Sequence, residues 1–219
     1  MLRLHTTFFV PLAVLIASNC GYADPIQLFA NLTNSQENPP TNPTTVAGGP
    51  RTSFGTASFL INDALTSMTF TATIFGIDFT GSQSVDTNDN LTAAHIHAAP
   101  TVTPTTNGPV VWGFFGAPFN DNSPNDVVIA PFNGVGGVIS GKWDLNEGNN
   151  TTLTAQLPNI LSGHAYINFH TTQFGGGEIR GAINVVPEPS LVLLVGIGLV
   201  AIIGLHRRRR MATRPCTSE

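Results

Sequence analysis

The sequence predicts an all-β domain, an antiparallel β-sandwich or barrel of about eight to nine short strands, followed by one C-terminal transmembrane helix. Three observations lead to this prediction. Apolar and polar residues alternate over most of the central region, as they do in strands with one buried face. Turn-forming Gly, Pro, Asn and Asp separate the alternating segments. Outside the two ends, no segment has a convincing helical period of 3.6 residues.

The predicted strands follow one another across the central region, which is rich in Thr, Val, Ile and Phe. The first three alternate most strictly and cover residues 26–33, 55–61 and 68–75. The later ones are expected at 92–98, 109–115, 137–144, 152–157, 164–171 and 178–185. Polar loops are expected at 38–50, 80–90 and 119–126, and the glycines of 175–177 predict a tight connection with positive φ.

The N-terminus has the pattern of a secretory signal. Arg3 precedes an apolar region at 8–17, and Gly21 and Ala23 put small residues where a signal peptidase cleaves. Residues 1–23 are therefore predicted to be a signal peptide, with a retained N-terminal anchor or lipidation at Cys20 as the alternatives. The exported domain would then cover residues 24–186.

The C-terminus has the pattern of a membrane anchor. Residues 191–205 hold only Leu, Val, Ile, Ala and Gly, which predicts a transmembrane helix over about 190–206. A basic stop follows, and it favours the cytoplasmic side of the membrane; it consists of Arg207, Arg208, Arg209 and Arg210. Residues 211–219 would form a short cytoplasmic tail, and the domain before them would lie outside the cytoplasm.

The tripeptide Pro187, Glu188 and Pro189 stands directly before this apolar segment. Together with the arginine cluster, the stretch 186–210 resembles the PEP-CTERM sorting signal of Gram-negative bacteria, and we assign 187–210 to it. The resemblance implies export, transient anchoring in the inner membrane, and cleavage near the tripeptide by an exosortase-type sorting protease. It also implies a bacterium that makes extracellular polysaccharide.

The composition of residues 24–186 limits the possible partners. This region has eleven acidic and three basic residues, a formal net charge of −8, against −4 for the whole chain. So acidic a surface argues against binding nucleic acid or anionic lipid. Cys20 and Cys216 both lie outside the region, so the exported domain is expected to have neither a disulfide nor a catalytic thiol.

Four histidines in the exported domain form the strongest candidate site. His95 and His97 are two residues apart on a predicted strand and so project from one face, and His164 and His170 lie on one face of a later strand. If the two strands are neighbours, three or four imidazoles would converge, which suits Zn or Cu. The alternative is two exposed or hydrogen-bonded histidine pairs without a metal.

Other motifs are weaker. The loop 86–90 has the acidic opening of a calcium loop but lacks its glycine and its terminal glutamate, so an ordinary Asp/Asn loop is favoured. The aromatic residues Trp112, Phe114, Phe115 and Trp143 are expected to pack in the core, with a sugar-binding surface as the alternative. Glu178 and Arg180 share a strand face and are expected to pair with each other or with a neighbour.

Six segments in this order resemble a CHRD domain, the module named after chordin and also found in bacterial exported proteins. They are FANLTNSQENPP at 29–40, GTA at 55–57, AHIHAAP at 94–100, GPVV at 108–111, AYINFHT at 165–171 and GEIRG at 177–181. The resemblance implies an all-β extracellular module without an established catalytic role. The His-x-His strand is also loosely similar to copper/zinc superoxide dismutases, but the metal loop and disulfide cysteines of those enzymes are missing, so no dismutase activity is inferred.

The sequence thus predicts an exported, non-enzymatic CHRD-type protein, a binding module of the cell surface or the extracellular polysaccharide matrix. Its expected partners are signal peptidase, an exosortase-type protease, the inner membrane and extracellular polysaccharide, with no nucleic acid and no required cofactor. It would be anchored with the domain on the periplasmic side and reach the cell surface or the medium after processing. The alternative is a copper- or zinc-binding protein or redox enzyme that uses His95, His97 and His170, with His164 as a fourth ligand.

Overall fold

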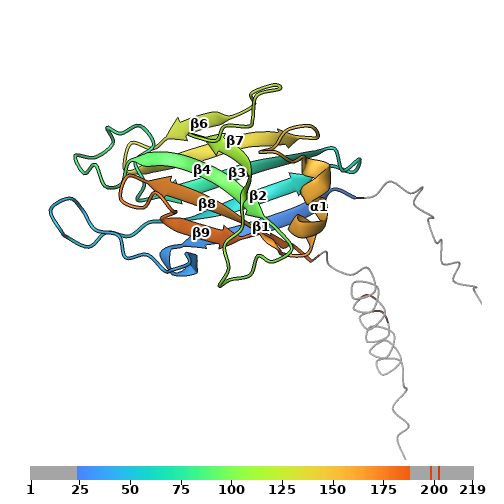
Figure 1. The fold of residues 1–219 in the computed structure, drawn as a ribbon, viewed down its shortest axis with the longest axis horizontal. Coiled ribbons are helices and arrows are strands. Elements are labelled where there is room, and N and C mark those ends of the chain that lie inside the picture. The colour runs from blue at the N-terminus through green and yellow to red at the C-terminus, as the bar shows by residue number, and fades with distance from the viewer. Residues whose placement is uncertain (1–23, 188–197, 199–201, 203–219) are drawn as a thin grey trace, which may run out of the picture.

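The computed structural model describes residues 24–187, 198 and 202, in which an all-β domain carries a single α-helix (Figure 1). The domain contains a short 3-10 helix, η1 (Asn34–Gln36), and one α-helix, α1 (Leu153–Leu161). The strands are β1 (Ile26–Thr33), β2 (Phe54–Ile61), β3 (Ser67–Phe75), β4 (Leu91–Ala98), β5 (Val110–Phe115), β6 (Val128–Pro131), β7 (Gly136–Asp144), β8 (Ala165–Thr171), β9 (Ile179–Ala182) and β10 (Asn184–Val185).

All strands belong to one antiparallel sheet. Its order is β5-β4-β8-β9-β1-β2-β3-β7-β6, and the short β10 also pairs with β1. The sheet curls so that its two halves face each other as the layers of a sandwich do, and within the described residues its edge strands β5 and β6 do not pair with each other. The result is an open half-barrel, so the all-β prediction is confirmed but the closed barrel is not.

The core fills the space between the two halves of the sheet. Phe70 of β3 packs against Trp112 and Phe114 of β5, with ring centroids 5.6 and 4.6 Å apart. Trp143 of β7 stacks on Trp112 at 5.5 Å. These aromatic residues are fully or almost fully buried, which confirms that they pack in the core and removes the alternative of a sugar-binding surface built on the tryptophans.

The helix α1 corrects one strand prediction, that of 152–157. Leu153, Leu157 and Ile160 are the buried residues of α1, a spacing of four and three that places them on one helical face. Thr152 caps the helix, since its hydroxyl accepts a hydrogen bond from the Ala155 amide at 3.3 Å. The apolar residues at 153, 155 and 157 suggested alternation only because the window was too short to separate the two periods.

The strand β6 was also missed, because it lies between the predicted loop 119–126 and the predicted strand 137–144, where no element was expected. All four of its residues are exposed, so neither face has the apolar alternation by which a strand is recognised. The predicted strand 178–185 is divided in the structure into β9 and β10, on either side of the buried Ile183.

Both ends of the domain emerge beside α1 (Figure 1). The amide of Val186 donates to the Gln27 carbonyl at 2.9 Å, so the chain stays attached to β1 up to the residue before Pro187. In the part of the chain that the structure describes, no helix is long and apolar enough to cross a membrane. The predicted signal peptide, Glu188, Pro189, the arginine cluster and almost all of the predicted transmembrane segment lie outside the described residues.

The packing of Phe70 leads to the first prediction. Replacing this residue, 3% exposed, with Ala leaves a cavity between the two halves of the sheet, and we expect the free energy of unfolding to fall by about 3–5 kcal/mol. Urea unfolding followed by Trp fluorescence measures it. The matched control is Phe54→Ala on the neighbouring strand, because Phe54 is 50% exposed and should contribute less than about 1 kcal/mol. Equal losses for the two variants would contradict the core described above.

Candidate metal centre

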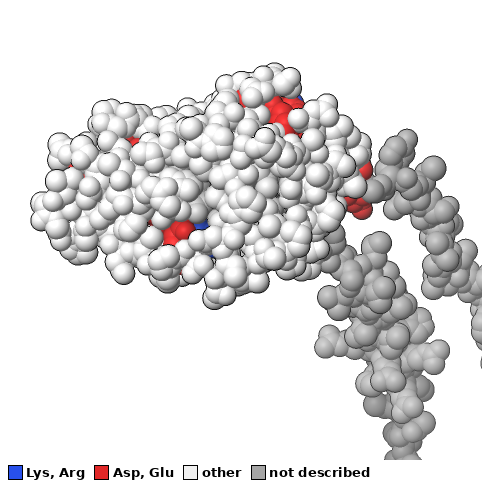
Figure 2. Space-filling view, viewed as in Figure 1, with Lys and Arg blue, Asp and Glu red and all other residues white. Residues whose placement is uncertain are grey.

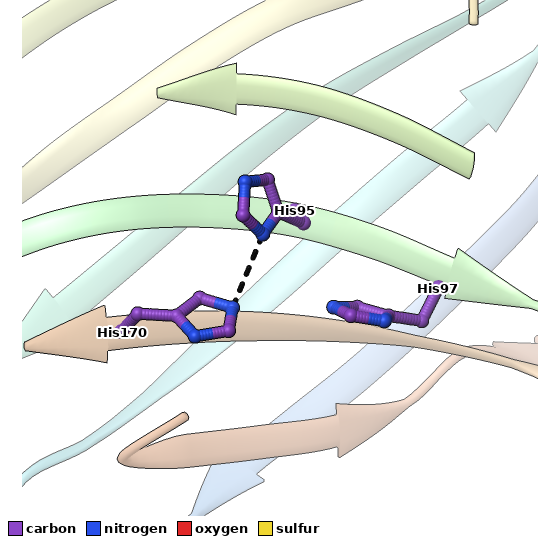
Figure 3. A group of neighbouring side chains, drawn as sticks. All are labelled: His95, His97 and His170. Carbon is purple, nitrogen blue, oxygen red and sulfur yellow. Dashed lines mark hydrogen bonds between the residues drawn. The ribbon is translucent and has the colours of Figure 1, made fainter. Parts of the chain in front are cut away.

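Three histidines meet on the outer face of β4 and β8, away from the core (Figure 3). His95 and His97 alternate along β4 with Ile96, which is fully buried in the core. The strand β8 pairs with β4 and brings His170 to the same face, with Ala93 as its cross-strand partner. The neighbouring-strand arrangement that the His-x-His prediction required is therefore present.

The three rings converge on a common point. One nitrogen from each of His95, His97 and His170 lies within 4.8 Å of the other two, and His95 Nδ1 is 3.1 Å from His170 Nε2. The residues are 4%, 8% and 7% exposed, so loops shield the cluster almost completely from solvent.

Backbone carbonyls hold the second nitrogen of each ring. His95 Nε2 lies 3.1 Å from the Ala117 oxygen, His97 Nδ1 2.9 Å from the Gly108 oxygen, and His170 Nδ1 3.0 Å from the Gly175 oxygen. A carbonyl oxygen can only accept, so in each ring the outward nitrogen carries the proton and donates it. This fixes the tautomer of all three histidines, as second-layer partners do at metal sites.

The nitrogens that face one another therefore present lone pairs. In the neutral rings, His95 Nδ1 and His170 Nε2 would both be acceptors at 3.1 Å, and buried His97 Nε2 has no hydrogen-bond partner within the described residues. Three buried acceptors without a donor are unfavourable. Either an extra proton or a cation must lie among them.

Burial opposes the extra proton. Loss of solvent lowers the pKa of His95 to about 4, with a further decrease from the charge of His170. Burial also lowers the pKa of His97 to about 4 and that of His170 below its ordinary value. All three rings are therefore neutral at pH 7, which is the protonation state that binds a metal ion.

Glycine allows a loop to approach the cluster closely. A Cβ atom at Gly113 of β5 would lie 1.8 Å from the Pro118 carbonyl oxygen. Because no such atom is present, the chain from Gly116 to Pro118 can fold back over β5 and present the Ala117 carbonyl to His95. A glycine at position 113 is therefore needed for the Ala117 carbonyl to reach His95.

The structure separates His164, the fourth predicted ligand, from the other histidines. It precedes β8, and its Nδ1 lies 2.8 Å from the Val102 carbonyl oxygen. Among residues 24–187, the group that could hold a metal consists of His95, His97 and His170.

A second buried polar group adjoins the histidines, and the sequence did not indicate it. The ring of Tyr166 stacks on His97 with centroids 4.6 Å apart, and the Arg180 guanidinium lies 3.8 Å above the Tyr166 ring. Arg180 therefore does not pair with Glu178, which forms a bidentate ion pair with Arg51 at 2.5 Å. Only the two-residue period of β8, which puts Tyr166 on the face of His170, was visible in the sequence.

Glu37 completes this second group. The residue follows η1 and is 6% exposed, and burial raises its pKa to about 7 against the opposing effect of Arg180. Its Oε1 and the Oδ1 of Asn168 both lack hydrogen-bond partners within the described residues. Gly177 lies between them, since a Cβ there would be 2.7 Å from Glu37 Oε1 and 2.5 Å from the Asn168 amide.

The loop 86–90 is held by its own hydrogen bonds. Asp86 Oδ1 accepts from the amides of Val46 and Asn88, and Asp89 accepts from the Ser84 hydroxyl at 3.0 Å. This is the ordinary Asp/Asn loop favoured by the sequence. On the face seen in Figure 2, charged side chains form small separate patches among uncharged residues.

A curled antiparallel sheet whose outer face carries a loop-covered histidine cluster defines an all-β module with a candidate metal centre. The family comparison agrees: the model of the CHRD domain matches residues 28–183, and the chain belongs to the CHRD domain family. A second model, the PEP-CTERM protein-sorting motif, matches residues 185–210 and implies export and processing by exosortase-type machinery. Comparison with curated proteins and with solved structures gave no match.

The buried carboxyl of Glu37 leads to the second prediction. Because its folded-state pKa of about 7 lies above the ordinary 4.5, the native state binds the proton more tightly, and stability falls as pH rises from about 4.5 to 7. We expect metal-free Glu37→Gln to match the natural protein at pH 5 and to be more stable at pH 8, by up to about 3 kcal/mol. Urea unfolding at the two pH values measures it. Asp63→Asn at an exposed turn is the control, and an equal pH response in both variants would refute the assignment.

Proposed function

We propose that this exported CHRD domain binds one transition-metal ion through His95 Nδ1, His97 Nε2 and His170 Nε2. The observation that supports the proposal is the set of three buried lone pairs directed at one another, each fixed by a backbone carbonyl on the far side of its ring. A metal cation satisfies all three acceptors at once, whereas a proton satisfies at most two.

The distances fit such an ion after a small movement of the side chains. Metal–nitrogen bonds of about 2.0–2.1 Å place pairs of ligand nitrogens about 3.3–3.6 Å apart in trigonal or tetrahedral sites. The distance of 3.1 Å between His95 Nδ1 and His170 Nε2 lies just below this range. All three ligand nitrogens lie within 4.8 Å of one another, a limit that is above the range. Since the group contains imidazoles and neither carboxylates nor thiolates, it favours copper or zinc over calcium or magnesium.

The sorting motif supports a role for this site outside the cytoplasm. Export and sorting by exosortase-type machinery follow from the match over residues 185–210. We propose that the mature domain carries its metal at the cell surface or in the surrounding matrix. Three further statements remain predictions from the sequence: binding to extracellular polysaccharide, the lack of enzymatic activity and the lack of nucleic-acid binding.

The metal content of the purified protein provides the third prediction. Protein exported to the periplasm without a polyhistidine tag should contain close to one equivalent of copper or zinc by mass spectrometry. The double variant His95→Ala, His97→Ala should lose nearly all of it, because a single remaining imidazole cannot hold the ion.

The control is His164→Ala, which removes the neighbouring histidine that the structure separates from the cluster. It should retain the full metal content. A folded natural protein that takes up neither copper nor zinc would refute the metal proposal, and so would a double variant with unchanged content.

The sorting tripeptide provides the fourth prediction. Changing Pro187, Glu188 and Pro189 to Ala should leave export unchanged but prevent cleavage, so that the protein stays in the membrane fraction at its uncut mass. Deletion of residues 211–219, beyond the basic cluster, is the control and should be processed normally. Release of the triple-alanine variant at the natural mature mass would contradict the assignment of the cleavage signal. Comparing matrix-bound and free protein in the same cultures also tests the matrix prediction.

A further inference from the structure

The ligands of the proposed metal centre carry no charge to offset that of the ion. All three are imidazoles, which bind a metal ion in their neutral form, and within the described residues no aspartate, glutamate or cysteine belongs to the group. The site is also buried, so water screens the charge of an ion only weakly. A buried charge without an opposite charge is costly, and the cost grows steeply with the charge of the ion.

A fixed charge that acts on His97, that of Arg180, has the same sign as the ion. Arg180 is 3% exposed and stacks on the face of Tyr166, whose ring stacks on His97 in turn. The guanidinium donates to neutral acceptors only: Asn107 Oδ1 at 2.8 Å and the carbonyls of Thr103 and Thr106 at 2.6 and 3.3 Å. Among the described residues, no carboxylate forms an ion pair with it.

Glu37 is the acidic group that could offset Arg180, and it does so only in part. Its burial lets the carboxyl hold a proton near neutral pH, and its Oε1 has no hydrogen-bond partner within the described residues. The surroundings of the centre therefore remain neutral to positive below pH 7. Such surroundings discriminate between ions by their charge.

We propose that the centre selects copper(I) over copper(II), a preference that rests on the proposed metal binding. Three nitrogen donors without a fourth protein ligand suit a monovalent d¹⁰ ion that accepts three-coordinate geometry. A divalent ion would keep twice the uncompensated charge beside Arg180, and would need an added anion or water in a buried site. Copper(II) that enters the site is therefore reduced readily, taking one electron from an external reductant such as ascorbate to give bound copper(I).

The test compares the two oxidation states in the same exported full-length protein, purified in detergent without a polyhistidine tag. At pH 6.5 we would titrate copper(I) anaerobically against bicinchoninate, and copper(II) in air against a chelator of known affinity. The expected result is a dissociation constant for copper(I) at least tenfold below that for copper(II), a shift of about 59 mV in the one-electron potential relative to free copper. Equal or tighter binding of copper(II) would overturn the proposal.

Two variants at Arg180 test the origin of the preference. Arg180→Gln removes the positive charge. Two unit charges roughly 10 Å apart at an effective dielectric of about 20 change a binding constant about tenfold, and copper(II) carries one unit of charge more than copper(I). The preference for copper(I) should therefore fall by about that factor. Arg180→Lys keeps the charge and should keep most of the preference. Lys142→Gln is the control, because Lys142 pairs with Asp126 and Asp144 at 2.9 and 3.2 Å on β7.

The outcomes separate this inference from the proposed function. The metal proposal itself fails if the protein binds neither copper ion. It also fails if changing His95 and His97 to Ala leaves the affinity for both ions unchanged. If it binds copper through these histidines but prefers copper(II), only the preference fails. Equal effects of the Gln and Lys variants would remove Arg180 as its cause, and if Arg180→Gln does not fold, the comparison of copper(I) with copper(II) in the natural protein still decides.

Discussion

The structure depends on one constraint, the burial of both faces of the paired strands β4 and β8. In β1, β2 and β3 burial alternates, because one face packs in the core and the other meets solvent. In β8 every residue is buried, and in β4 the last five are. The outer face of this pair is nonetheless polar. Its imidazoles, amide and phenol cannot bond to water and must find partners in the loops that cover them.

Ion pairing and close backbone contacts hold those loops in place. Arg51 and Glu178 form a bidentate pair that is almost shielded from solvent, and Thr171 donates its hydroxyl to the same carboxylate at 2.6 Å. Arg180 ties β9 to the loop of Thr103 and Asn107 by hydrogen bonds to neutral acceptors. These contacts hold the segments that carry the Gly175 and Gly108 carbonyls, which accept from His170 and His97. The orientation of the cluster is thus a property of the covering loops as much as of the strands.

The regular part of the fold was predictable from local pattern. Strict alternation located β1, β2 and β3 to within a residue or two, because each strand has one buried and one solvent-facing side, and its apolar and polar residues alternate accordingly. The prediction failed where this alternation is absent or too short. The exposed edge strand β6 buries neither side, and the apolar spacing of α1 over its first five residues is the same as that of a strand. The open curl of the sheet depends on which strands remain unpaired, which no local pattern contains.

The sequence by itself determined the all-β class, the family, the sorting motif and the shared face of His95 and His97. Each of these follows from the order of residues within short segments of the chain. Only the tertiary structure decided that β8 pairs with β4, that His170 joins the cluster and that His164 does not. It also decided the tautomers and the position of Arg180 beside His97, through Tyr166. The physical reason is that these contacts join residues many positions apart, and their geometry follows from register and loop closure rather than from the local order of residues.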